Sequence, residues 1–315
     1  MHRIFFSCRV RPALQLLLLA LILPVTLPAI AHACACGCGV FDVGTPASLP
    51  AQAGGSISLE YDFMNQSANW SGASSAPAID NDDRQIRTNF VTASAQYLFG
   101  RKWGAMIQVP YWDRRFLTAD DGGEVLSFTH GAIGDIRIRG VYTGLSADLS
   151  TGLTAGLKLP TGDYRYANFD RDTEIGSGST DAILGAYHVG RLGASQRLTW
   201  FVDGQSELPF AYSGDYRPGA EVDASASLSY GAPHLGVARI TPVLGLVGSA
   251  RGRDAGSQAD PDDSGYDRLL LAPGVQVGVA GLHTALTVSV PLYEHVNGNQ
   301  LVAPALVKLV VGRGF

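Results

Sequence analysis

The sequence lacks any apolar run, apart from one near its N-terminus, that is long enough to form a transmembrane helix. A helix needs about 18 or more consecutive apolar residues to cross a bilayer. Membrane spans by helices are therefore excluded outside the N-terminal segment. Any other span must be made by strands, which have to close into a barrel so that no backbone group is left unpaired in lipid.

The one apolar run, over 13–23, has the features of an export signal. Three basic residues precede it: Arg3, Arg9 and Arg11. The small residues at 31–33 then suit a signal peptidase, so we expect residues 1–33 to be removed before Cys34. Acylation of Cys34 is disfavoured, because Ala31 and His32 fit a lipoprotein signal poorly.

Charge is also scarce, at 16% of the residues, and positive charge is in deficit. The formal net charge is −5. Loss of the three signal-peptide arginines, with no acid lost, brings it to about −8, and such a chain repels polyanions. A nucleic-acid partner is therefore excluded.

Cysteine is nearly absent. Cys8 leaves with the signal peptide, so three thiols remain in the expected mature chain: Cys34, Cys36 and Cys38. An odd number excludes a fully paired disulfide framework, and no Cys-x-x-Cys-His motif indicates covalent haem. Thiolates at alternate positions suit a soft metal ion such as Cu(I) or a redox relay. We interpret residues 34–53 as a periplasmic Cys-rich leader that binds a soft metal, docks a partner, forms a plug or makes an inter-chain disulfide.

Glycine is abundant, with 38 residues, and from Gly54 onward apolar and polar residues alternate in twelve segments. Such segments, joined by alternately long and short connections, predict an all-β transmembrane antiparallel β-barrel over 54–315 with about twelve strands. The predicted strands are 54–64, 85–98, 103–110, 134–143, 149–160, 180–190, 198–208, 219–231, 240–250, 268–279, 282–291 and 303–315. The long external loops are 65–84, 111–133, 161–179, 209–218, 251–267 and 292–302, and we expect short periplasmic turns between the other strand ends.

The two faces of each segment differ in chemistry. In 198–208, for example, Leu198, Trp200 and Val202 alternate with Thr199 and Asp203. A water-soluble β-sandwich also alternates, but it hides its apolar face in a core. In a barrel the polar face lines the lumen, and the candidates for that lining are Gln108, Asp135, Arg137, Arg139, Lys158, Asp181, Asp203, Glu207, Glu221, Asp223 and Ser289. These mixed charges either line a narrow pore or pair and close it.

Proline and the last residue add two local signals. Four predicted strands end on a polar residue, an apolar residue and a proline, at 108–110, 158–160, 207–209 and 289–291. Because proline has no amide hydrogen for a strand ladder, we expect these strands to leave the sheet there, at the outer rim. Phe315 ends an alternating strand, as in the assembly signals that outer-membrane barrels present to their assembly machinery.

With these positions laid out, the chain resembles the outer-membrane transporter family named for the meta-pathway of phenol degradation. The matching segments lie between about 100 and 315: 109–111, 134–135, 157–163, 176–181, 216–219, 271–274, 290–293, 296–298 and Phe315. The resemblance implies a barrel for small organic, aromatic or hydrophobic solutes. The Cys34–Cys38 leader is not part of the family's pattern.

Catalysis is not indicated, because the histidines are scattered without a convincing serine partner. Acidic residues dominate the long loops, which predicts an acidic rim that meets lipopolysaccharide through divalent cations; the run 260–267 misses the EF-hand spacing. We expect a passive channel in the outer membrane of a Gram-negative cell. Its partners would be lipid, lipopolysaccharide, the barrel assembly machinery and a small solute, with no cofactor except a soft metal at the leader. The alternative is a barrel whose cysteine leader binds metal or docks a periplasmic protein.

Overall fold

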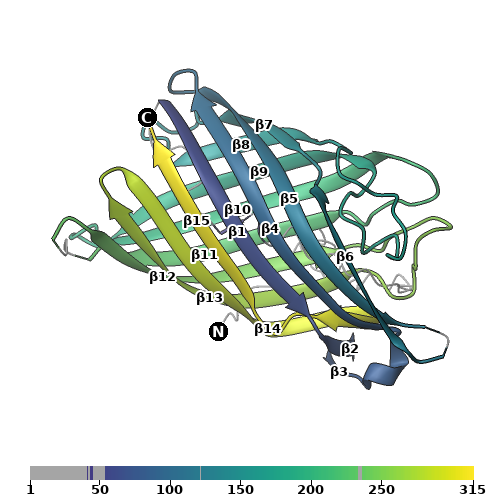
Figure 1. Cartoon of the computed structure of the whole chain (residues 1–315). Coiled ribbons are helices and arrows are strands. Elements are labelled where there is room, and N and C mark those ends of the chain that lie inside the picture. Colours follow the sequence, from purple (N-terminus) through teal and green to yellow (C-terminus); the bar gives the residue numbers. More distant parts are fainter. Residues whose placement is uncertain (1–40, 42, 45–53, 121, 233–235) are drawn as a thin grey trace, which may run out of the picture. The chain divides into compact units, whose positions relative to one another are not determined.

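Twelve antiparallel strands form a closed barrel in the part of the chain that the computed structural model describes, residues 41, 43–44, 54–120, 122–232 and 236–315 (Figure 1). The wall strands are β1 (Gly54–Gln66), β4 (Asp83–Leu98), β5 (Trp103–Ala119), β7 (Arg137–Tyr142), β8 (Thr151–Lys158), β9 (Ser179–Leu192), β10 (Leu198–Tyr212), β11 (Glu221–Tyr230), β12 (Arg239–Arg251), β13 (Tyr266–Val279), β14 (Leu282–Val302) and β15 (Leu306–Gly314). Each strand pairs with its neighbours in sequence, and β1 pairs with β15 to close the ring. The predicted fold class is confirmed. The expected signal peptide, 1–33, lies outside the described residues.

The barrel is apolar outside and polar inside. In β11, Val222 is 52% exposed whereas the next residue, Asp223, is 2% exposed. The same inversion runs along the strand, where Ala224 and Leu228 face outward and Ser225 faces inward. A water-soluble sandwich would bury the leucine and expose the aspartate. The exposed aliphatic belt is the surface that an outer-membrane barrel presents to lipid.

Three predicted loops contain strands. The segment 65–84 holds β2 (Ala68–Gly72), β3 (Ser74–Ser75) and a short 3-10 helix (Ala78–Asp80), and 111–133 holds the outer half of β5 and its partner β6 (Val125–Ile133). The predicted loop 292–302 is the outer half of β14, which pairs with β2. These strands extend beyond the apolar belt, where no lipid imposes an apolar outer face, so the alternation that marks the wall does not mark them.

The prolines do not end their strands as expected, except for Pro160, which follows β8. Pro110 lies within β5, opposite Thr92. Pro209 adjoins a bulge in β10, and β14 inserts Leu292 just after Pro291. A bulge leaves an amide unpaired, so a residue without an amide hydrogen fits beside it. Exposed aromatic side chains follow three of these prolines and mark the outer edge of the lipid-facing belt: Tyr111, Phe210 and Tyr293.

The short turns and the C-terminus lie at one end of the barrel, and the long loops lie at the other (Figure 1). The β13–β14 turn consists of Ala280 and Gly281, whose φ angles of 49° and 80° give the primed turn that suits twisted hairpins. Phe315 continues the β1–β15 ladder by two backbone hydrogen bonds with Gly55, and its ring is 71% exposed. No helix in the described residues is long and apolar enough to cross a membrane.

The main hydrophobic cluster lies inside the barrel. It combines inward side chains of the wall, such as Phe90, Leu270 and Leu306, with Phe41 and Val43 from the segment before β1. The lumen is therefore packed at this level by a piece of the chain's own N-terminal region. Above it, toward the long loops, the lining becomes charged.

Candidate functional site: a charged belt across the lumen

Charged side chains from successive strands meet at one level of the lumen and form a belt. The β-ladder sets this level, because Arg137 on β7 is in register with Lys158 on β8, and Lys158 with Asp181 on β9. Glu207 on β10 is in register with Glu221 on β11. All of these side chains share the inward face, since residues directly opposite each other in a ladder point to the same side of the sheet.

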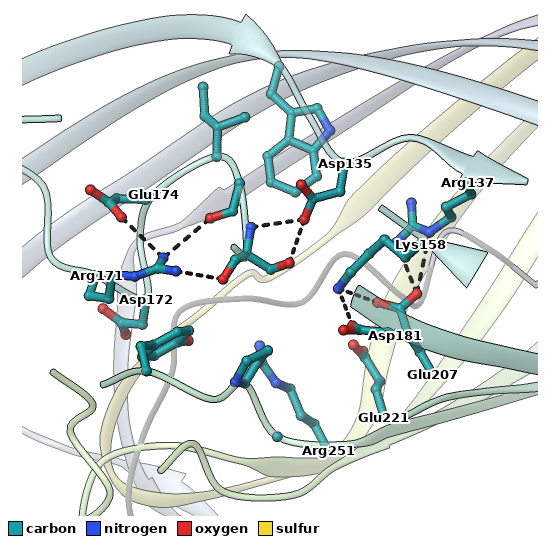
Figure 2. A pocket seen from close by; sticks show the side chains of 17 residues that line it. Asp135, Arg137, Lys158, Arg171, Asp172, Glu174, Asp181, Glu207, Glu221 and Arg251 are labelled. Atoms are coloured by element: carbon teal, nitrogen blue, oxygen red, sulfur yellow. Dashed lines mark hydrogen bonds and ion pairs between the residues drawn. The ribbon is translucent and has the colours of Figure 1, made fainter. Parts of the chain in front are cut away.

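Lys158 lies at the centre of the belt (Figure 2). Its ammonium group contacts Asp181 and lies 2.6 Å from Glu207 Oε1. The guanidinium of Arg137 reaches the other oxygen of Glu207 at 3.3 Å. Glu207 is thus held by two cations from two strands, and the positions of all these side chains are fixed by ion pairs rather than by packing.

The belt continues on the opposite wall through residues that the sequence did not single out. Tyr266 donates a hydrogen bond of 2.6 Å to Glu221, and Arg251 lies 2.8 Å from Asp254. Below Tyr266, Arg268 pairs with Glu294 at 3.4 Å. Alternation along 268–279 could have placed Arg268 inward, but Glu294 and Asp254 lay in segments predicted as loops.

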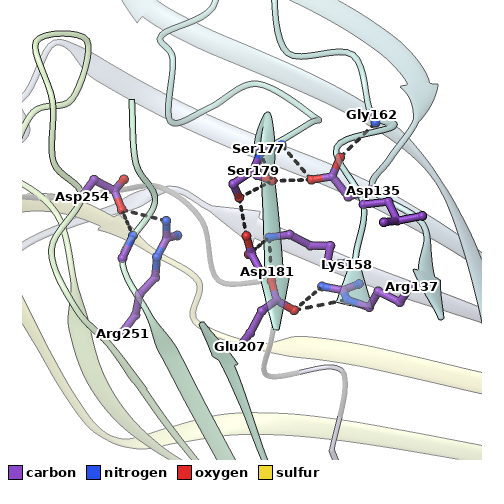
Figure 3. Close-up of polar contacts among 12 residues, drawn as sticks. Asp135, Arg137, Lys158, Gly162, Ser177, Ser179, Asp181, Glu207, Arg251 and Asp254 are labelled. Carbon is purple, nitrogen blue, oxygen red and sulfur yellow. Dashed lines mark hydrogen bonds and ion pairs between the residues drawn. The ribbon is translucent and has the colours of Figure 1, made fainter. Parts of the chain in front are cut away.

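The connection between β8 and β9, residues 159–178, folds inward over the belt instead of extending away from the barrel. Asp135 anchors it: its carboxylate accepts hydrogen bonds of 2.9 Å from the amides of Gly162 and Ser177 (Figure 3). Arg114, fully buried on β5, donates to the carbonyl oxygens of Thr173 and Glu174. Asp135, predicted as a lumen residue, therefore positions a loop rather than a strand neighbour. The sequence does not point to Arg114, because its pattern predicts a loop over 111–133.

Within this connection, Glu174 is a buried acid with strong partners. Its carboxylate accepts a hydrogen bond from the Tyr166 amide at 3.1 Å and pairs with Arg171 at 3.1 Å. Burial raises the pKa of Glu174 above its usual range, although the Tyr166 amide and Arg171 oppose that rise. The Arg171 guanidinium also lies 4.3 Å from the ring centre of Tyr216, which ties this connection to the one between β10 and β11.

Of the remaining predicted lumen residues, four lie below the belt, whereas Gln108 is in register with Arg137. Asp203 accepts hydrogen bonds from the backbone amide of Gly44, and Ser289 lines the cavity beside Phe41. Arg139 and Asp223 are buried on inward faces, and Gln108 is partly buried with its amide oxygen covered. All five face inward; Gln108 shares the register of the belt, and the other four lie below it.

Cavities along the barrel narrow at the belt. The outer mouth holds a cavity of about 490 Å³ lined by acidic side chains such as Asp83, Asp172 and Asp260, and the periplasmic end holds one of about 460 Å³ lined by Phe201 and His283. Between them, the cavity at the belt measures about 70 Å³ and the one beside Phe41 about 40 Å³. Of these four cavities, the two at the belt and beside Phe41 are the smallest, so the lumen is most tightly filled at those two levels.

Two acidic side chains at the outer cavity accept hydrogen bonds from nearby backbone amides. In the described part of the chain no group of three or more His, Cys, Asp or Glu side chains could hold a metal ion. Asp263 instead accepts a hydrogen bond of 2.6 Å from the Asn299 amide, and Asp260 caps its own turn. The predicted metal ligands Cys34, Cys36 and Cys38 lie outside the described residues.

The fold and the inside-out arrangement of side chains define an outer-membrane β-barrel. No protein-family model matches the chain, and no curated protein matches it significantly. Among solved structures it is similar to the COG4313 outer membrane channel from Pseudomonas putida F1, with a TM-score of 0.64 and 15% identity over 87% of this chain and 100% of that chain. At this identity, the likeness extends to the fold alone.

Two further solved barrels are less similar. The beta domain of the Bordetella autotransporter Brka has a TM-score of 0.48 and 10% identity over 84% of this chain and 100% of that chain. The Pseudomonas putida toluene transporter TodX has a TM-score of 0.45 and 11% identity over 90% of this chain and 96% of that chain.

Proposed function

We propose that the protein is a narrow passive channel of the outer membrane for small uncharged solutes, and not an enzyme. The observation that carries this proposal is the belt at the constriction, where Arg137 and Lys158 are paired with Asp181 and Glu207. Paired charges of opposite sign give little net field across the lumen, so they neither attract nor repel a neutral molecule. An ion, in contrast, would have to break these pairs to pass.

The solute class follows from the lining beneath the belt. Phe90, Leu270 and Leu306 form an apolar lining inside the lumen, which Phe41 covers in the structure and which suits small aromatic or hydrophobic molecules. The resemblance to the transporter family of the phenol meta-pathway supports the same class. We therefore include membership of that family in the proposal.

The test is conductance and uptake with matched charge reversals. Lys158→Glu should shift the ion permeability ratio in planar bilayers at least threefold toward cations, because it leaves the belt with unpaired negative charge. Lys102→Glu is the matched control: Lys102 is exposed in the turn between β4 and β5 and should leave the ratio unchanged. Proteoliposomes should take up phenol faster than empty vesicles do.

Equal effects of Lys158→Glu and Lys102→Glu would show that the belt does not govern passage. Phenol uptake that is no faster with the folded wild-type barrel than with empty vesicles would contradict the proposed solute class. Folding of each variant is checked by the shift in gel mobility between heated and unheated samples.

We also propose, as the alternative function, that the cysteine leader binds a soft metal or docks a periplasmic protein. The three thiols lie within the seven residues before Phe41, which is anchored in the lumen, so metal binding would act close to the barrel. Metal analysis of the purified, reduced mature protein tests it. Less than one Cu(I) per chain would count against this function.

A further inference from the structure

The segment that contains Phe41 and Val43 occupies a site built by the barrel wall. Phe41 is 9% exposed and Val43 is 4% exposed, and both belong to the buried cluster that contains the inward side chains Met64 of β1, Phe90 of β4 and Leu306 of β15. These wall residues come from strands whose other faces point outward to lipid. The ring of Phe41 therefore fills space inside the lumen, at the level just below the charged belt.

Two charged wall residues hold the backbone of this segment. The Gly44 amide donates to the Asp203 carboxylate, with oxygens at 3.2 and 3.3 Å. The Lys308 ammonium donates to the Phe41 carbonyl oxygen, and it also lies 3.5 Å from Glu60. Both hydrogen bonds go to backbone atoms, so the wall recognises the segment by its shape and by one aromatic side chain rather than by ionic partners.

The surroundings of the Phe41 ring are those of an aromatic binding site. The ring centre lies 5.5 Å from that of Phe90, with planes tilted by 53°, and Phe90 in turn lies edge-on to Trp112 at 4.9 Å. The Lys308 ammonium lies 5.9 Å from the Phe41 ring centre. Offset and tilted aromatic pairs, together with a cation near a ring face, are favourable contacts for any phenyl-sized ligand.

We propose that this lumen site binds a small uncharged aromatic molecule, and that Phe41 is a tethered internal occupant which the solute must displace. The inference rests on the proposed channel function and names a site within it. Apolar cavities of about 150 Å³ lined by leucine and phenylalanine side chains bind benzene, so a phenyl ring removed from this site leaves a suitable space. A tethered occupant competes at a high effective concentration and weakens the apparent affinity for a free ligand.

The test uses the full-length protein, purified in detergent and shown to be folded by its heat-dependent gel mobility, with fluorobenzene as the probe in ¹⁹F NMR titrations. Phe41→Ala should bind fluorobenzene at least tenfold more tightly than the wild type. The matched control is Phe210→Ala, because Phe210 faces outward and its loss should leave the affinity unchanged. Adding Phe90→Ala to Phe41→Ala should abolish the gain, which locates the bound probe beside Phe90.

Equal affinity in the wild type and Phe41→Ala would overturn the inference, and so would a gain that survives Phe90→Ala. If Phe41→Ala does not fold, Asp203→Asn provides the second test. It weakens the hold on Gly44 while keeping the side-chain shape, and it should tighten fluorobenzene binding about threefold; no change there would also overturn the inference.

The outcomes separate this site from the channel itself. Tighter fluorobenzene binding by Phe41→Ala, with phenol uptake by every variant no faster than that of empty vesicles, would support the binding site and contradict the proposed channel function. If wild type and Phe41→Ala take up phenol equally, faster than empty vesicles do, and bind fluorobenzene with equal affinity, the result would support the channel and contradict the binding site.

Discussion

Individual leucine and aspartate residues occupy opposite positions to those they take in water-soluble proteins. Leu246 on β12 points outward, whereas Asp223 on the neighbouring strand is buried in the lumen. Each outward leucine gains from contact with hydrocarbon, and each inward acid needs partners or water, because an isolated charge is costly in an apolar medium. The identity of a residue thus reports the face on which it lies.

This distribution predicts that an arginine on the outer face lowers the free energy of unfolding by an amount that depends on its depth in the membrane. Leu246→Arg, near the middle of the apolar belt, should lower the free energy of unfolding by about 2–4 kcal/mol, and Leu208→Arg, near the outer rim, by about 0–1 kcal/mol. Urea titration of barrels folded in phospholipid vesicles measures both values. An equal loss of stability at the two positions would mean that the exposed aliphatic surface of the barrel does not face lipid.

At the scale of elements, the connection 159–178 is more constrained than a surface loop. Asp135, between β6 and β7, and Arg114, on β5, hold it, and Arg171 links it to Tyr216. Since it covers the belt, its stability governs access from outside. Because buried polar groups hold this connection, its stability depends on their protonation, whereas the stability of an apolar loop would not.

A pH dependence of this connection follows from Glu174. Its pKa in the folded protein is raised by burial, so protonation favours the folded connection. That stabilisation is fully present below the unfolded pKa of about 4.3 and is lost as the pH rises through the folded pKa. Protease cleavage within 159–178 should therefore be slower at pH 4 than at pH 7. Glu174→Gln should remove most of this difference, and a variant that keeps the full difference would assign it to another group.

Alternation in the sequence predicted the wall strands within a few residues, because lipid and lumen impose opposite chemistry on the two faces of strands such as 198–208 and 219–231. It failed for β6 and for the outer halves of β5 and β14, which extend past the lipid and lose that constraint. It also placed Pro110, Pro209 and Pro291 at strand ends. Pro110 lies within β5, where the partner strand changes from β7 to β6, and the bulges next to Pro209 and Pro291 leave no local signal. The lumen charges were predicted where they lie on wall strands, but their pairing depends on register across strands. Nothing in the sequence around Phe41 indicates that its ring lies inside the barrel.

At the scale of the whole molecule, the short turns and long loops define two ends with different surroundings. The long connections at one end include 252–265, and the short turns at the other include 143–150 (Figure 1). We assign the loop end to the cell exterior, as in outer-membrane barrels generally.

This orientation predicts which insertions antibodies can reach on intact cells. An epitope tag placed in 257–260 should be labelled without permeabilisation, because these residues lie in an outer loop. The same tag in 145–148, which form an exposed turn at the other end, should be labelled only after the outer membrane is opened. Labelling of the turn on intact cells would reverse the orientation and, with it, the assignment of the acidic cavity to the exterior.

The pairing of β1 with β15, here called the seam, also determines when the barrel can close during folding. Ser56 pairs with Gly314, so the earliest wall strand to be synthesised has to wait for the latest before its free edge is covered. Every other wall pairing joins neighbours in sequence, which makes those contacts quick to form, whereas the seam carries the full cost of closing the chain on itself. Until then the exported chain presents an open edge strand that can pair with other chains. The interval between export and closure is therefore the period in which this protein most depends on chaperones, and its length is set by the delivery of β15.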